Sequence, residues 1–234
     1  MKLLKTIAYG ACFMLIGTVA FAQSQSMKSS NETSVEDIYL NSVQDVIITE
    51  LANSQDYDNK LVALQYLEDS VKGGKVSDEQ KAALKSLAGE GITTRVRQNG
   101  RLMNNFPDIR AKACDLLGEI KTEDSKNALL TILTEDAEPM VASAAVRSLG
   151  NIGINNNDEV LSAIEFIQHK YAALNPTSSF AFEILDAYEK LAPTAQDKRS
   201  MIESVTEIAS NYRFATPVRL KALTLLKNLQ SENR

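Results

Sequence analysis

The sequence predicts an all-α protein, an α-solenoid of about five stacked antiparallel helix pairs. Three observations indicate this fold class. The 234 residues are 44% hydrophobic but include only 10 Gly and 5 Pro, which excludes disordered and fibrous chains and favours helix. Apolar residues recur at helical spacing from Val35 onward, without any alternation of strand length. A short motif also recurs along the chain, which is typical of stacked repeats.

The first 22 residues have the three parts of a secretory signal peptide. Lys2 and Lys5 precede an uncharged run, residues 7–22, which ends in a small-x-small triplet at 20–22. We expect cleavage after Ala22 and a periplasmic or secreted protein. A retained membrane anchor is the alternative, but the run is shorter than the about 20 apolar residues that a spanning helix needs. No stable membrane span is expected after cleavage.

Removal of this signal peptide changes the charge and the cysteine content of the chain. The whole chain has a formal charge of −5, and it becomes more acidic when the two leader lysines are lost. Cys12 is lost as well, so Cys114 remains without a partner for a disulfide and packing must supply the stability. Residues 23–36 are polar and predict a flexible leader, and residues 37–234 predict a single solenoid domain.

Amphipathic runs joined by short polar segments predict the helices in order. Residues 37–54 form the first, and its apolar side is predicted to carry Ile38, Val43, Val46, Ile47 and Leu51. The next helix, at 58–71, is expected to end at the glycine pair 73–74. A capping box at 77–80 precedes a helix at 82–87. Further runs lie at 124–133, 160–174 and 199–212, and no strands are predicted.

The repeated motif is clearest at residues 107–120 and 139–152, which are offset by 32 residues. A third copy occupies 217–229, and weaker copies fit at 59–70 and 180–191. Equivalent small residues are expected to let helices approach closely. They are Ala63, Ala113, Ala145 and Ala222, with Gly118 and Gly150 in the last turn. The position of Cys114 is apolar in every copy, which predicts that it faces a neighbouring repeat.

The pattern Pro-x-Val/Ile-Arg-x-x-Ala-x-x-x-Leu-Gly-x-Ile resembles the second helix of a HEAT repeat, and in particular the short type also found in phycobilisome lyases. The resemblance implies a right-handed curved stack. It also implies that Arg110 and Arg219 tie neighbouring repeats together through hydrogen bonds. Lys60 occupies the same position, whereas Ala142 and Ala181 interrupt the series.

No catalytic, metal or cofactor site is predicted. Cys114 is expected to be a small buried residue, because its equivalents in the other repeats are apolar. His169 is the only histidine, so a zinc site with several soft ligands is excluded and a structural or surface role is expected. A catalytic base would need a partnered nucleophile, and the sequence marks none.

One set of residues is predicted to line the exposed, concave side of the second helices. Three positions per repeat share one helix face. They are Lys112, Asp115 and Glu119, then Ala144, Arg147 and Asn151, then Glu183, Asp186 and Lys190, and finally Lys221, Thr224 and Asn228. This mixed charge favours a polar protein or peptide partner over nucleic acid. An ordinary solvated surface is the alternative interpretation.

Arg95, Arg97 and Arg101 form the densest basic group, within 93–105, where a long inter-helix loop would be a plausible contact site.

The sequence as a whole predicts an exported, non-catalytic interaction module or scaffold in the cell envelope. An enzyme like the bilin lyases is the alternative, and a HEAT-like DNA-repair enzyme is another. Export and acidic charge disfavour both.

Overall fold

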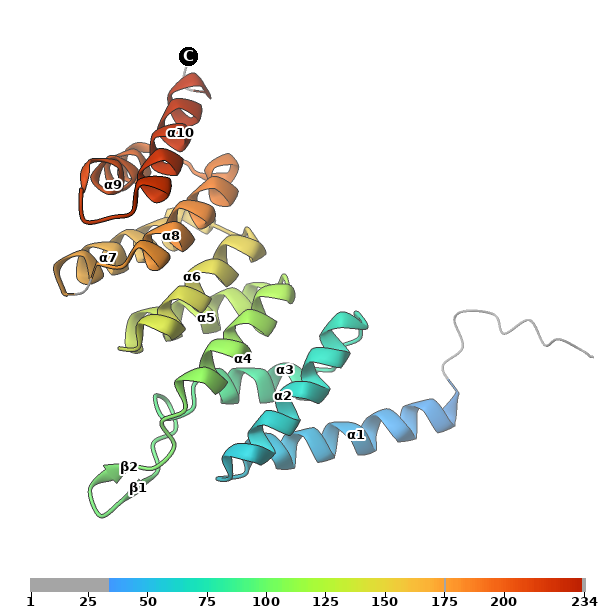
Figure 1. Cartoon of the computed structure of the whole chain (residues 1–234). Helices are drawn as coiled ribbons and strands as arrows, with labels where there is room; N and C mark the ends of the chain where they lie inside the picture. The colour runs from blue at the N-terminus through green and yellow to red at the C-terminus, as the bar shows by residue number, and fades with distance from the viewer. Residues whose placement is uncertain (1–33, 175, 233–234) are drawn as a thin grey trace, which may run out of the picture.

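Ten α-helices, arranged as five antiparallel pairs, stack as an α-solenoid in this computed structural model, which describes residues 34–174 and 176–232 (Figure 1). The predicted all-α solenoid is therefore confirmed. The helices are α1 (Val35–Asn53), α2 (Tyr57–Lys72), α3 (Asp78–Ala88), α4 (Pro107–Glu119), α5 (Glu123–Glu135), α6 (Pro139–Ile152), α7 (Glu159–Leu174), α8 (Ser178–Leu191), α9 (Arg199–Ser210) and α10 (Thr216–Glu232). Short 3₁₀ turns lie at Asn156–Asp158 and Ala192–Thr194.

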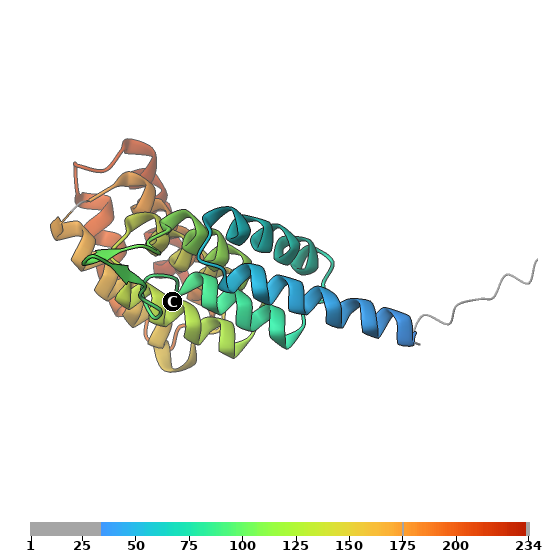
Figure 2. The same ribbon diagram turned by 90° about the horizontal axis from the view of Figure 1, so that it is seen from below.

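The pairs build two layers, with the odd-numbered helices in one and the even-numbered helices in the other. Each even-numbered helix packs against the next, from α2 through α4, α6 and α8 to α10. The five copies of the repeated motif correspond to these even-numbered helices, so all five belong to the same layer (Figures 1 and 2). Among the described residues, none of the helices is long and apolar enough to cross a membrane. The proposed signal peptide lies outside the described residues.

The helix boundaries follow local capping chemistry. Ser77 caps α3 by accepting a hydrogen bond from the backbone amide of Gln80 at 3.1 Å, as the predicted capping box requires. The reciprocal half of the box does not form, because the Gln80 side chain donates to Asp45 on α1 instead, at 2.7 Å. Gly74, at φ +67°, takes the left-handed conformation just beyond the end of α2.

The prediction of no strands was wrong at one place. Two short strands, β1 (Arg97–Gln98) and β2 (Arg101–Leu102), pair antiparallel and form a hairpin between α3 and α4. Asn99 and Gly100 form its turn, both with positive φ. Asn-Gly is the preferred sequence for a two-residue hairpin turn, and this signal lay within 93–105. The flanking strands are too short to show alternation.

Small residues set the close approach of the middle even-numbered helices, as predicted. A Cβ atom added to Gly118 would lie 2.6 Å from Cβ of Ser148 on α6, and one added to Gly150 would lie 2.8 Å from Cα of Ala187 on α8. Neither separation is possible for carbon atoms, so both positions require glycine. The equivalent alanines Ala63, Ala113, Ala145 and Ala222 are fully buried. Closely packed interiors of this kind do not tolerate added volume.

Only part of the predicted apolar side of α1 packs. Leu51 packs against the core next to the buried Ile48 and Ala52, whereas Ile38, Val46 and Ile47 are about half exposed. The first half of α1 extends beyond α2 and α3 (Figures 1 and 2). In the described residues, α1 and α2 have neighbouring helices on one side only, so part of their apolar surface has nothing to pack against.

Candidate interaction surface

The residues predicted to share one face of the even-numbered helices do lie side by side, and most of them bind one another. We call this set the even-helix face. Lys112 binds Glu68 at 2.8 Å, which joins α4 to α2. Arg147 binds Asp115 at 2.8 Å and Glu183 at 2.7 Å, so a single guanidinium links three consecutive even-numbered helices. These contacts run along the stack.

The same face continues on α8 and α10. Lys190 donates to the amide oxygen of Asn151 at 2.7 Å. Lys221 binds Asp186 and, at 3.3 Å, Glu189, and its ammonium lies 4.6 Å from the centre of the Phe182 ring. Every cation of the predicted set therefore has a partner on a neighbouring repeat.

The remaining predicted positions behave differently. Glu119, Thr224 and Asn228 are exposed, and no ion pair of Glu119 occurs among the described residues. Ala144 was expected on this face, but it is buried at the contact between repeats. An alanine methyl has no reason to face solvent when close helix packing can cover it.

The ion pairs have an electrostatic consequence at Glu68. Hydrogen bonds from Lys112 and then from Lys72 lower the pKa of this carboxyl to about 2. Asp69 on α2 and Glu119 on α4 are exposed acids. Lys112, Arg147 and Lys221 are neutralised by carboxylates of neighbouring helices, whereas Lys190 donates to the neutral amide of Asn151 and keeps its charge.

A second, buried group of charges lies at the base of the hairpin, and most of its members have no signal in the sequence. Lys60 donates to Glu90 at 2.9 Å and to the carbonyl of Ala52 at 2.8 Å. Arg110 binds Asp136 at 2.7 Å, with both side chains 2% exposed. The implied role in tying repeats is thereby confirmed for Arg110, since Asp136 lies in the loop between α5 and α6 of the next pair. It was wrong for Arg219, which donates to the carbonyl of Ala209 within its own pair. Buried charges persist only when they are paired and hydrogen-bonded.

Asn104 connects this buried group to the hairpin. Its amide nitrogen donates to Glu90 at 2.7 Å and to the carbonyl of Thr94 at 2.6 Å, while its oxygen accepts from the backbone amide of Val96 at 2.9 Å. Arg110 also reaches the carbonyl of Glu90, at 3.3 Å. Both sides of the hairpin base are thus fastened to the solenoid. Only Lys60 and Arg110 had a signal in the sequence, their shared place in the repeat.

The hairpin presents the predicted basic group to solvent. Arg95, Arg97 and Arg101 are all exposed, and in the described part of the chain none of them pairs with a carboxylate. Arg95 instead donates to the carbonyl of Ile92 at 3.1 Å. Figure 1 shows the hairpin extending away from the helices. This basic surface contrasts with the even-helix face, where every cation of the predicted set is paired.

The other chemical candidates occupy ordinary positions. Cys114 is fully buried, and burial raises the pKa of its thiol, which keeps it protonated and unreactive. His169 is exposed and lies 3.5 Å from Glu207. In the ranges 34–174 and 176–232, no three His, Cys, Asp or Glu side chains are grouped as metal ligands would be.

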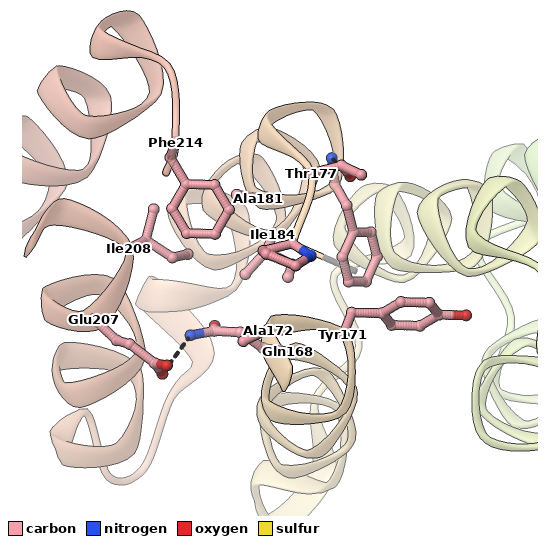
Figure 3. Close-up of a pocket in the computed structure, with 11 residues that line it drawn as sticks. Gln168, Tyr171, Ala172, Thr177, Ala181, Ile184, Glu207, Ile208 and Phe214 are labelled. Carbon is pink, nitrogen blue, oxygen red and sulfur yellow. Dashed lines mark hydrogen bonds between the residues drawn. The ribbon is translucent and has the colours of Figure 1, made fainter. Parts of the chain in front are cut away.

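A small apolar cavity lies between α7, α8 and α9, beside Ala181 (Figure 3). Tyr171, Ile184, Ile208 and Phe214 line it, and Gln168 donates across its edge to Glu207 at 3.4 Å. Its volume is about 20 Å³, which is room for about one water molecule. Ligand sites for small molecules are commonly at least about 300 Å³, so this cavity is a packing gap.

Comparison with known proteins gives a match for the middle of the stack. Residues 101–169 match the family of HEAT repeats. The chain matches no curated protein and no solved structure. The matched residues cover β2, α4 to α6 and most of α7, which include Arg110, Gly118 and Gly150. This segment is similar to HEAT repeats, and the helix pairs on either side of it stack in the same way.

Proposed function

We propose that this protein is an exported, non-catalytic interaction module that holds a protein partner in the cell envelope. One observation carries the proposal: the hairpin displays three arginines without carboxylate partners in a chain whose formal charge is −5. A HEAT-repeat stack is well suited to this role, because it offers an extended surface that its own packing holds rigid.

The way the hairpin is anchored supports the same function. Burying Lys60, Glu90, Arg110 and Asp136 costs free energy of desolvation, and their mutual pairing offsets that cost. A plain loop could join α3 to α4 without this arrangement. Fastening the base through Asn104 reduces the entropy that the hairpin would lose on binding. The anchoring therefore favours a contact made by the hairpin itself.

The chemistry of the hairpin selects the partner. Arginine guanidinium groups bind carboxylates in bidentate geometry, and three of them within seven residues suit an acidic protein segment. Nucleic acid is disfavoured, because no aromatic side chain lies among residues 93–105 to stack on bases. The formal charge of −5 would also repel a phosphate backbone.

Site-specific photocrosslinking in intact cells tests the proposal. A photoreactive residue at Gln98, on the exposed hairpin, is expected to capture a defined protein. The same residue at Phe166, exposed on α7 in the other layer, is the matched control and should capture nothing. Changing Arg95, Arg97 and Arg101 to Glu should abolish capture at position 98. No product above background at 98, or an equal product at 166, would refute the proposal.

Export has a separate test. Mass spectrometry of the protein from the cell envelope is expected to find Gln23 at the N-terminus, since the small-x-small triplet ends at Ala22. Recovery of a chain beginning at Met1 in the soluble cytoplasmic fraction would overturn the location. It would leave the hairpin contact to be judged by the crosslinking experiment.

A further inference from the structure

The two ends of the stack both expose apolar side chains that resemble the inside of a joint between repeats. At the first pair, Val62 and Tyr66 on α2 are 41% and 43% exposed. At the last pair, Leu220 and Leu223 on α10 are 58% and 53% exposed. Terminal repeats of soluble solenoids normally carry a polar outer face. These ends do not.

The internal joints show which face of an even-numbered helix meets which neighbour. Gly118 on α4 abuts Ser148 on α6, and Gly150 on α6 abuts Ala187 on α8. The glycine position therefore faces the following repeat, and the serine or alanine position faces the preceding one. Residues four positions apart share a helix face. Cys114, which precedes Gly118 by four, therefore also faces forward, and it is fully buried.

The exposed residues at the two ends occupy these same positions in the repeat. Leu223 is equivalent to Cys114 and faces forward, where the described chain has no following pair. Tyr66 is equivalent to Ser148 and Ala187 and faces backward, and Val62 lies one turn before it. Tyr66 also borders a hollow of about 190 Å³ with Leu40, Val43 and Ile47 of α1. The α10 end and the α2 end therefore expose the two faces that meet in each internal contact between repeats.

The charges of the two ends are complementary. Helix α1 carries four acidic residues and neither Lys nor Arg, and Asp69 is exposed on α2. On α10, Lys227 is exposed, whereas Lys221 binds Asp186 and Glu189 of α8 and Arg219 donates to a backbone carbonyl of α9. Contact between two N-terminal ends would bring like charges together, whereas contact between opposite ends pairs unlike charges.

The last joint inside the chain is the closest template for such a contact. Lys227 occupies the glycine position of the motif, which is Gly118 on α4 and Glu189 on α8. Glu189 binds Lys221 at 3.3 Å, so the contact of α8 with α10 accommodates a long side chain in this position. By the same geometry, Lys227 of one copy would reach Val62 of the next, which is equivalent to Lys221, and Tyr66 lies one turn further along α2.

We propose that this chain associates head to tail with further copies of itself, with α10 of one copy packing on α2 and the exposed part of α1 of the next. The contact is heterologous. In a dimer, one copy keeps a free α10 end and the other a free α2 end, so further copies can add until the assembly closes or stops. The occupant of both apolar ends is therefore the same protein.

Sedimentation velocity at increasing concentration tests this with the chain as it is recovered from cells. The weight-average mass of the unchanged protein should rise above twice the protomer mass. Tyr66→Asp and Leu223→Asp should each sediment as protomers, because each loses one end. An equal mixture of the two should form a dimer and nothing larger, since one intact α10 end meets one intact α2 end.

Each other occupant of these ends predicts a different result. Contact between two N-terminal ends leaves Leu223→Asp dimeric, and coverage of α2 by residues 1–33 of the same chain leaves the unchanged protein a protomer at every concentration. Either result would overturn the proposal. Phe166→Asp, an exposed aromatic on α7 away from both ends, is the matched control and should assemble normally. Circular dichroism melting verifies that each variant is folded.

Discussion

The motif position that carries Arg110 is used differently in the two halves of the stack. In the first half, Lys60 and Arg110 bring buried charges and bind Glu90 and Asp136. In the second half, the position is a buried alanine on α6 and α8, and Arg219 on α10 is only partly buried and donates to a backbone carbonyl of its own pair. Tyr171 on α7 instead reaches the loop between α5 and α6, where it donates to the carbonyl of Ala137 at 3.2 Å.

This difference separates a role in stability from a role in positioning. An apolar side chain in this position would incur little desolvation cost, as α6 and α8 demonstrate, so the fold does not require charge there. The charged positions occur where the hairpin between α3 and α4 must be held. We infer that the first half retains buried charges at this position to fix the base of the hairpin. The second half has no buried charge at this position, because the loops between its helices are short.

Arg110→Ala should produce the largest effect. It leaves the Asp136 carboxylate buried without its cation, and breaking a buried pair costs about 3–5 kcal/mol in the free energy of unfolding. Urea denaturation measures the loss. Arg219→Ala, at the same position in the last pair, is the control. Among the described residues, its guanidinium donates only to the carbonyl of Ala209, so about 1 kcal/mol is expected. Equal losses would show that the position acts alike throughout the stack.

Lys60→Met should have the next largest effect, about 2–3 kcal/mol, because the buried Glu90 carboxylate then loses its ion pair. The double variant Lys60→Met with Glu90→Gln removes the buried charge as well and should recover at least half of the loss. The rate of limited proteolysis at Arg97 and Arg101 measures separately how firmly the hairpin is held. Failure of the double variant to recover stability would mean that the methylene stem of Lys60 matters more than its charge.

Tyr171→Phe tests the apolar half of the comparison. It removes one hydrogen bond and keeps the ring packed on Phe180, 5.0 Å away between centroids. A loss of about 1 kcal/mol is expected from thermal unfolding. Tyr212→Phe, whose ring is 83% exposed, is the control and should leave the melting temperature unchanged. A loss as large as that of Arg110→Ala would remove the distinction between the halves.

Arg147→Ala probes the exposed even-helix face. Its side chain is 38% exposed, so the ion pairs with Asp115 and Glu183 are screened and about 0–1 kcal/mol is expected. The difference from the unchanged protein should shrink further in 1 M salt. A salt-independent loss of several kcal/mol would place this residue with the buried charges.

The smallest effect concerns pH. The folded pKa of Glu68 is about 2, below its ordinary 4.5. Its ion pairs therefore contribute fully above pH 4.5 and are lost as the pH falls towards 2. Lys112→Gln should raise the Glu68 pKa towards 4.5, as followed by the carboxyl carbon shift in an NMR titration. An unmoved midpoint would show that Lys72 alone sets it.

Much of the fold could be predicted from local patterns. The even-numbered helices carry the repeated motif, and the capping residue Ser77 begins α3 where the sequence indicates. The hairpin was missed because its strands are only two residues long, although Asn99-Gly100 signalled the turn. The apolar side of α1 was predicted only in part, since Leu51 packs against the core but Ile38 and Val46 are exposed. Spacing shows that a helix has an apolar side, but not which repeat will cover it.

The candidate surface was predicted only in part. Helical spacing placed Lys112, Asp115 and Arg147 on one face, and the structure leaves them there. That Arg147 binds carboxylates on both neighbouring helices depends on the distance between repeats, which the spacing within one helix does not contain. Glu90, Asn104 and Asp136 lie outside the repeated motif, so no sequence pattern marked them as partners of Lys60 and Arg110.

The sequence by itself determined the class of fold, the helix order and the positions that needed Ala or Gly, because these follow from local periodicity and from a motif compared with itself. Only the tertiary structure decided which charges are paired, which are left free on the hairpin, and that both ends of the stack expose apolar side chains. Those properties depend on which residue meets which across a joint. Side chains far apart in the sequence meet there, and burial sets the strength of their charges.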